Sequence, residues 1–106
     1  MAAKQLMNAK EFETVIKKGV TLIDFNAPWC GPCQAQAPIL KKVSGKFEGR
    51  ALVAEMNIDT NQDTAARYFV QSIPTLIIFK DGKEVKRFIG FQGEHVLVSA
   101  LENSLN

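Results

Sequence analysis

The sequence lacks any long hydrophobic run and any large excess of charge of one sign. No stretch approaches the roughly 18 consecutive apolar residues that a membrane-spanning helix needs. Residues 1–19 carry scattered charges and no apolar run of the length that a signal peptide needs. The 13 basic and 11 acidic residues are spread along the chain, so the net charge of +2 provides no continuous positive field for phosphates. We therefore expect a cytoplasmic protein that binds neither membranes nor nucleic acid.

Metal ligands are also scarce, because the chain holds only two cysteines and one histidine. A Cys-x-x-Cys pair can be half of a zinc site, which would need two further sulfur or imidazole ligands. His95 is the only other candidate, and helical spacing groups it with Ser99 and Glu102 on a polar face, which predicts a solvated side chain. We therefore predict no metal site within this chain.

The length of the chain indicates the number of domains, and the expected compartment indicates the role of the cysteines. A chain of 106 residues, 46% of them hydrophobic, fits one compact domain over residues 1–106. A domain of this size can bury roughly 65% of its unfolded surface. In a reducing compartment a pair of cysteines is seldom a structural staple, so a redox or metal role is favoured over a stabilising disulfide.

Helical patterns alternate with β-rich apolar runs along the chain, which predicts an α/β fold with a central sheet. The turn signal of residues 80–83 predicts a hairpin, which makes the sheet mixed and its last strand an edge strand. The predicted strands are 20–25, 51–58, 74–79 and 84–90. The predicted helices are 10–18, with Asn8 as a possible cap, then 32–47 and 64–70, and a last helix with Leu97, Val98, Leu101 and Leu105 on one side.

The helix over residues 32–47 carries a proline at position 38, which predicts a kink. Its apolar residues fall on one predicted face, which would pack against the sheet. These residues are Ala35, Ile39, Leu40, Val43 and Phe47.

Both cysteines lie in the segment DFNAPWCGPC, residues 24–33. Cys30 precedes the helix that Pro32 starts, where free backbone N–H groups and the helix dipole favour a thiolate. We therefore predict that Cys30 is the nucleophile. Cys33 falls in the first turn, shielded by the helix but close enough to bond to Cys30, and is predicted to be the resolving thiol.

Two further residues stand out near the cysteines. Asp24 interrupts an apolar strand, and a buried carboxylate is costly unless it is protonated or paired; the alternative is an aspartate at a strand end that faces water. Pro74 starts a strand in QSIPTLIIF, either as an ordinary strand-start proline or with a cis peptide bond that shapes a binding edge. If strands 20–25 and 51–58 are neighbours, burial and the nearby charge of Glu55 would both raise the pKa of Asp24.

With these residues in place, the sequence resembles the thioredoxin family. The similarity runs nearly from end to end, and the combination of WCGPC with a downstream Ile-Pro-Thr is much more specific than a lone Cys-x-x-Cys. It is carried by APWCGPC, the strand with Asp24 and Phe25, Pro38, NIDTN, SIPTLIIF, DGK and Gly90.

The resemblance implies the thioredoxin fold, with a central mixed β-sheet flanked by helices on both faces, and the activity of a protein disulfide reductase. Cys30 would attack a substrate disulfide and Cys33 would release the reduced substrate. Asp24 would help to deprotonate Cys33 through water, and the peptide bond before Pro74 would be cis. The family works without a bound cofactor, as a monomer that receives electrons from a thioredoxin reductase and passes them to disulfide-containing proteins.

The resemblance also implies an apolar substrate-binding rim around the cysteines. Ile73 would offer backbone hydrogen bonds to an extended substrate segment. Trp29 could instead be a packing residue, but its place in a Gly/Pro loop favours a contact surface. The implied substrate-binding residues are Trp29, Gly31, Pro32, Ile58, Ile73, Pro74, Gly90 and Phe91.

Three positions depart from the common family pattern. Asn26 replaces an aromatic residue that often supports the active-site loop, Gln34 replaces a frequent lysine, and Glu55 stands where a lysine commonly pairs with the buried aspartate. These departures bear on the redox potential more than on the reaction type. Two rival functions stay open: an oxidant or isomerase, and a peptide-binding or subunit-stabilising module with incidental thiols.

Overall fold

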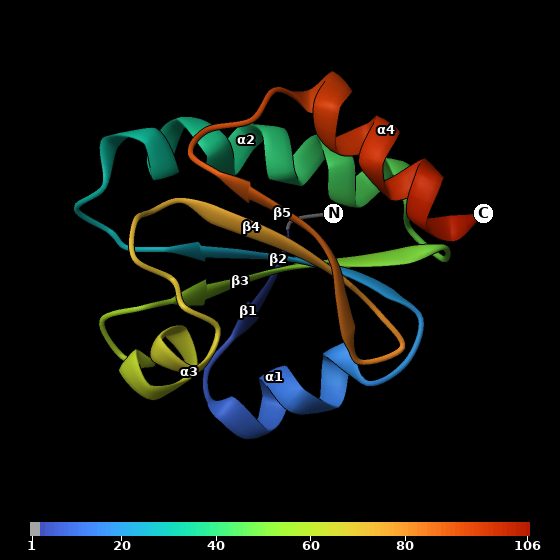
Figure 1. The fold of residues 1–106 in the computed structure, drawn as a ribbon. Helices are drawn as coiled ribbons and strands as arrows, with labels where there is room; N and C mark the ends of the chain where they lie inside the picture. Colours follow the sequence, from blue (N-terminus) through green and yellow to red (C-terminus); the bar gives the residue numbers. More distant parts are fainter. Residues whose placement is uncertain (1–2) are drawn as a thin grey trace.

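A five-stranded mixed sheet forms the centre of the molecule in the computed structural model, which describes residues 3–106 (Figure 1). The strand order is β1-β3-β2-β4-β5; β1, β3 and β2 are parallel, whereas β4 and β5 run antiparallel to their neighbours. The strands are β1 (Lys4–Leu6), β2 (Val20–Asn26), β3 (Ala51–Asn57), β4 (Thr75–Lys80) and β5 (Lys83–Ile89).

Helices cover both faces of this sheet. The helices α2 (Gly31–Lys46) and α4 (Glu94–Leu105) lie on one face, and α1 (Ala9–Ile16) and α3 (Gln62–Arg67) lie on the other (Figure 1). Each face has its own apolar core, with Leu22, Leu40 and Leu97 in one and Phe12 and Phe25 in the other. The predicted α/β fold with a mixed sheet between two helical layers is confirmed.

Local sequence signals account for several element boundaries. Asn8 caps α1 by accepting a hydrogen bond from the backbone N–H of Glu11. The sheet's hairpin turns through Asp81 and Gly82, both with positive φ, as the Asp-Gly pair predicts. Helix α2 continues through Pro38 to Lys46. None of the helices within residues 3–106 has the length and apolar character needed to cross a membrane.

Two features of the fold differ from the sequence-based expectations. Strand β1 was not predicted, because it has three residues and only Leu6 among them is buried. In α2 the prediction of Ala35 on the buried face was wrong: Ala35 is exposed and Gln36 is buried instead. The chain uses Gln36 as a hydrogen-bonding residue in the core, which an apolar pattern cannot reveal.

Candidate active site

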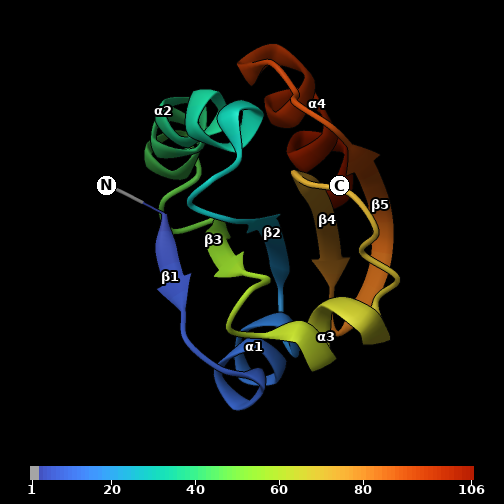
Figure 2. The same ribbon diagram turned by 90° about the vertical axis from the view of Figure 1, so that its left-hand side faces the viewer.

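Four of the connections at one end of the sheet hold or adjoin the predicted site residues, and this end faces the viewer in Figure 2. They are the β2–α2 loop, the β3–α3 loop, the α3–β4 loop and the β5–α4 loop. Every predicted site residue lies in these connections or in the adjoining ends of the elements. The fold therefore gathers residues from positions 24 to 91 around one small area.

Cys30 and Cys33 form a disulfide at the start of α2, with their Cα atoms 5.2 Å apart. Cys30 is the N-cap residue in an extended conformation, and its Sγ accepts a hydrogen bond from the backbone N–H of Cys33 at 3.2 Å. A sulfur held there faces the free N–H groups and the positive end of the helix dipole, which stabilise a thiolate.

Exposure does not separate the two cysteines in this oxidised form. The sequence predicted a shielded Cys33, but the predicted nucleophile Cys30 is just as buried, and each residue is only 5% exposed. Both pack with Ala27 and, at the edge of this cluster, with Ile58 and Ile73. The distinction between the two thiols therefore lies in the capping geometry of Cys30.

The peptide bond between Ile73 and Pro74 is cis, as predicted. The carbonyl oxygen of Ile73 lies 3.8 Å from Cys30 Sγ, so the start of β4 passes directly beside the disulfide. The backbone N–H of Gly90 donates to the carbonyl oxygen of Pro74 at 2.8 Å, which ties the end of β5 to the same place. Gly90 has a φ of 96°, a conformation that favours glycine.

Exposed apolar side chains surround the disulfide. Trp29 is 67% exposed, and its indole N–H donates to Asp59 Oδ2 at 2.9 Å. Phe91 is exposed, and Ile58 and Ile73 are half-buried. Gly31 and Pro32 are exposed at the first turn of α2. The structure thus places the predicted rim residues at the same end of the sheet, whereas Pro74, also predicted to bind substrate, is buried.

Two residues that support this surface were missed in the sequence. The side chain of Gln36 donates to the carbonyl oxygen of Gln92 at 2.9 Å and accepts from its N–H at 2.8 Å, which fixes the β5–α4 loop to α2. Asp59 holds the Trp29 ring by its indole nitrogen. Gln36 follows Cys33 by three residues, so helical spacing alone could have placed it on the face of the resolving cysteine.

Asp24 lies beneath this surface and is fully buried, which contradicts the water-facing alternative. It is the direct register partner of Glu55 on β3. Burial first, and then the charge of Glu55, raise the pKa of Asp24 to about 7, although a hydrogen bond from Asn26 opposes the change. Burial also raises the pKa of Glu55. The predicted direction for Asp24 is confirmed.

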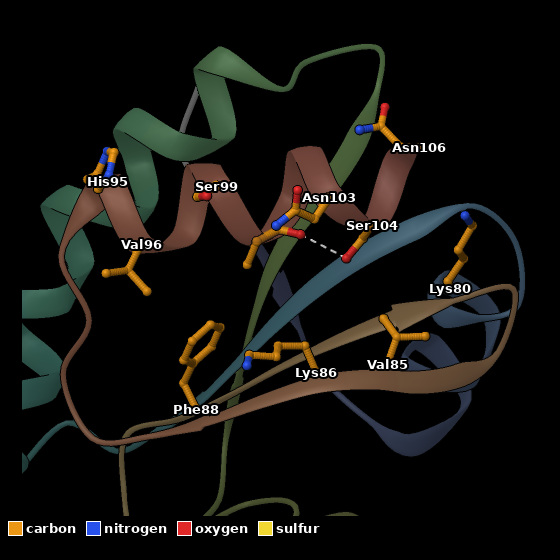
Figure 3. Close-up of a pocket in the computed structure, with 11 residues that line it drawn as sticks. Lys80, Val85, Lys86, Phe88, His95, Val96, Ser99, Asn103, Ser104 and Asn106 are labelled. Carbon is orange, nitrogen blue, oxygen red and sulfur yellow. Dashed lines mark hydrogen bonds between the residues drawn. The ribbon is translucent and has the colours of Figure 1, made fainter.

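A further concave region lies elsewhere, between α4 and β5 (Figure 3). This groove of about 670 Å³ is lined by Lys86, Phe88 and Val96 among others, and by none of the predicted site residues. His95 stands at its rim and is exposed, as predicted. Residues 3–106 contain no group of three His, Cys, Asp or Glu side chains that could hold a metal ion.

A disulfide within one helical turn, bordered by an apolar rim and a cis proline, is the working part of proteins that exchange thiols and disulfides. Comparisons with known proteins give the particular family. The family model described as Thioredoxin matches residues 3–103. A thioredoxin from Staphylococcus epidermidis is 45% identical over 95 residues, covering 90% of this chain and 91% of that protein. A thioredoxin from Staphylococcus aureus is 44% identical with the same coverage.

Solved structures agree with the sequence relatives. A mutant thioredoxin from Halobacterium salinarum has a TM-score of 0.93 at 33% identity, covering 99% of this chain and 92% of that chain. A mitochondrial thioredoxin from Saccharomyces cerevisiae in its oxidized form has a TM-score of 0.86 at 29% identity, covering 95% and 94%. The chain belongs to the thioredoxin family. It is a thiol–disulfide oxidoreductase, and its redox-active centre is the pair Cys30 and Cys33.

Proposed function

We propose that Cys30 is the attacking thiol and Cys33 the resolving thiol in the reduction of protein disulfides. The observation that carries this assignment is the N-cap position of Cys30, whose sulfur accepts the N–H of Cys33 at 3.2 Å. In the reduced protein the Cys30 thiolate attacks one sulfur of a substrate disulfide, and the other substrate sulfur leaves as a thiolate. Cys33 then attacks Cys30, the second substrate thiolate leaves, and the protein keeps the disulfide. The substrate gains the two electrons that the protein loses.

Asp24 is proposed as the group that takes the proton of Cys33 through water before this second attack. A general base works best when its pKa lies near the working pH. Burial and Glu55 bring the pKa of Asp24 to about 7, which supports this role at neutral pH. Cys33 and Asn26, the neighbour of Asp24 on the same face of β2, line one cavity of about 450 Å³. This cavity offers space for water beside Cys33, although Asp24 itself does not line it.

The substrate is proposed to be an extended protein segment that carries the disulfide. Its backbone would pair with Ile73 beside the disulfide, and its side chains would contact Trp29 and Phe91. The exposure of these aromatic side chains supports this, because an apolar patch beside a reactive centre is typical of a docking surface. Gly31, Pro32, Ile58 and Gly90 complete the proposed surface, and the buried Pro74 would act through its cis peptide bond, which shapes the binding edge.

The proposed partners are a thioredoxin reductase, which restores the dithiol, and disulfide-containing proteins. The family relationship supports both. We further propose that the chain acts as a single domain and as a monomer in the cytoplasm, and that thiol–disulfide exchange needs no bound cofactor, because both electrons reside in the two sulfurs.

Insulin reduction driven by dithiothreitol tests the proposed order of attack. Wild-type protein should accelerate precipitation of reduced insulin, and Cys30→Ser should abolish the acceleration. Cys33→Ser, reduced and then freed of dithiothreitol, should retain one attack on insulin and accumulate a covalent mixed disulfide with it, visible by mass. Mixed disulfides that accumulate on Cys30→Ser and not on Cys33→Ser would reverse the assignment.

A double variant separates an enzyme from a peptide-binding module. Replacing both Cys30 and Cys33 with serine leaves the apolar rim in place but removes the exchange chemistry. The proposed function predicts that this variant captures no partner covalently and supports no insulin reduction. A double variant that still stabilises a partner as well as wild type would favour the module.

A further inference from the structure

One side chain connects the two carboxylates beneath the disulfide. Asn26 lies two residues after Asp24 on β2, and so on the same face of the strand. Its side-chain Nδ2 donates to Glu55 Oε1 at 2.8 Å and to Asp24 Oδ2 at 3.4 Å. An amide NH₂ carries two hydrogens, so it can serve one oxygen of each carboxylate at the same time.

The two oxygens of Asp24 consequently differ. Oδ2 receives the Asn26 hydrogen bond, whereas Oδ1 is buried and has no hydrogen-bond partner within residues 3–106. A buried oxygen without a partner is costly when the carboxylate is charged, but it is the natural acceptor for an incoming proton. Asn26 thus leaves Oδ1 as the reactive oxygen.

The surroundings of this carboxylate pair supply no ion-pair partner within residues 3–106. Within residues 3–106, no ion pair links Asp24 or Glu55 to a lysine or arginine. The register partners on the outer sides are uncharged, with Gln5 beside Glu55 and Leu76 beside Asp24. The helices packed on this face bury uncharged residues and one cysteine. They are Cys33, Gln36, Leu40 and Val43 of α2, and Leu97 and Leu101 of α4.

We propose that Asn26 is a positioning residue for proton transfer from Cys33. Its amide fixes Asp24 by Oδ2 and holds the negative charge of Glu55 alongside, so that Oδ1 receives the Cys33 proton. This inference rests on the proposed function of Asp24. The balance is simple: the proton passes from Cys33 through water to Oδ1, the Cys33 sulfur attacks Cys30, and Asp24 returns the proton to solvent after release.

Asn26 and Glu55 act on Asp24 with opposite signs. The Asn26 amide stabilises the charged carboxylate and lowers the pKa of Asp24, whereas the charge of Glu55 raises it. Removing the amide should therefore make Asp24 a stronger base, and removing the Glu55 charge should make it a weaker one. A side chain that only fills space would produce no such pair of opposite changes.

The test is the titration of the Asp24 carboxyl carbon by NMR in the reduced protein. Asn26→Leu should move the midpoint of the Asp24 titration upward by about one pH unit, because it removes one hydrogen bond to a charged group. Glu55→Gln should move the midpoint downward by a similar amount, because it removes the neighbouring negative charge. Gln5→Leu is the matched control, because Gln5 faces Glu55 from β1 without a hydrogen bond to either carboxylate, and it should not move the midpoint. Asn26→Gln, which keeps the amide, should restore part of the wild-type value and replaces the leucine variant if that variant does not fold.

A second readout follows the chemistry. The rate of release from a preformed mixed disulfide with a peptide should depend on pH, and its midpoint should move with the carboxyl titration in each variant. Equal or same-sign shifts of the carboxyl midpoint for Asn26→Leu and Glu55→Gln would overturn the positioning role. Opposite carboxyl shifts with an unmoved release profile would overturn proton transfer to Asp24. Neither result would affect the attack by Cys30, which the insulin assay tests separately.

Discussion

The two ends of the central strand β2 are built in opposite ways. At its start, the N–H of Gly19 donates to Asp81 Oδ1 at 2.8 Å and the N–H of Asp81 donates to the Gly19 carbonyl oxygen at 2.9 Å. At its finish, Asp24 is buried with one oxygen that has no partner within residues 3–106, and the following loop exposes Trp29. At one end the polar groups bond to each other, whereas at the other end a carboxylate oxygen has no protein partner within residues 3–106 and an aromatic side chain is exposed.

The same contrast is visible in residues with positive φ. At the start of β2 they are Gly19 and, in the neighbouring hairpin, Asp81 and Gly82, residue types that adopt this conformation readily. At the active-site end they are Gly90, which adopts it readily, and Phe69, for which it is unfavourable. Features that cost stability thus gather where the chemistry takes place, as is expected of functional sites.

The largest effect on stability is expected from Asp24→Ala. The folded pKa of about 7 lies above the reference value of 3.8, so the acid contributes stability that is fully present below pH 3.8 and is lost as pH rises through 7. Wild type should therefore lose stability relative to Asp24→Ala between pH 5 and pH 8, by about 3 kcal/mol at roughly 1.4 kcal/mol per pH unit. Denaturant unfolding of both proteins at the two pH values measures the difference.

Asp24→Asn provides the control for this measurement, since it keeps the shape but does not titrate. Its stability should follow that of Asp24→Ala in its pH dependence. A constant difference between wild type and both variants from pH 5 to pH 8 would show that Asp24 does not ionise in this range, and its proposed role as a base would fail with it.

Trp29, the exposed aromatic residue at the active-site end, should affect substrate binding and have little effect on stability. Trp29→Ala should raise the KM for insulin about tenfold, because loss of a central aromatic contact typically costs on the order of 1–2 kcal/mol of binding. The free energy of unfolding should change little, since the side chain is mostly in water. Val85→Ala, at an exposed apolar residue outside the proposed surface, should leave KM unchanged. An equal effect of both substitutions would remove Trp29 from the proposed docking surface.

Most of the sheet could be predicted from the sequence, because its strands are short apolar runs bounded by turn residues. The strands around Ile23 and Ile77 are buried on both faces, so their patterns are continuous and easily read. The hairpin at Asp81 and Gly82 follows from local turn chemistry alone. The disulfide of Cys30 and Cys33 could be predicted equally well, since their spacing and the intervening Pro32 act within one helical turn.

Other parts depend on contacts between distant residues and could not be predicted. Helical spacing puts Gln36 on the face of Cys33, but its hydrogen bonds depend on Gln92, 56 positions later, which presents both backbone groups to it. From the sequence, Asn26 was noted only as a replacement for an aromatic residue that supports the active-site loop. Its hydrogen bond to Glu55 depends on the register of β2 and β3. Cys30 is less exposed than expected of a nucleophile because Ile73, which precedes the neighbouring strand β4, packs against the two cysteines. The roles of such residues can be recognised only when the pairing of the strands is known.

At the start of β2, where Gly19 and Asp81 are hydrogen-bonded, a substitution should change the free energy of unfolding but not the activity. Asp81→Ala removes the side-chain bond to Gly19 and places alanine at a φ of 51°, so it should lower the free energy of unfolding by about 1–2 kcal/mol. Insulin reduction should stay at the wild-type rate, because this turn lies at the opposite end of β2 from the disulfide. Asp81→Asn keeps an acceptor oxygen and tolerance of positive φ, and should cost much less. A loss of activity in folded Asp81→Ala would contradict the separation of the two ends.

The smallest expected effect has the opposite sign and lies at the active-site end, in the α3–β4 loop (Figure 2). The N–H groups of Phe69 and Val70 donate to the carbonyl oxygens of Ala66 and Ala65, so α3 ends in a Schellman motif with Phe69 at the position that favours glycine. Its φ is 56°, and its side chain is 77% exposed, so burial does not offset the unfavourable backbone. Phe69→Gly should therefore raise the free energy of unfolding by about 0.5–1 kcal/mol, the left-handed penalty less the entropy cost of glycine. Phe69→Ala keeps the penalty and should not stabilise; if alanine stabilises as much as glycine, the cause is the exposed ring and not the backbone.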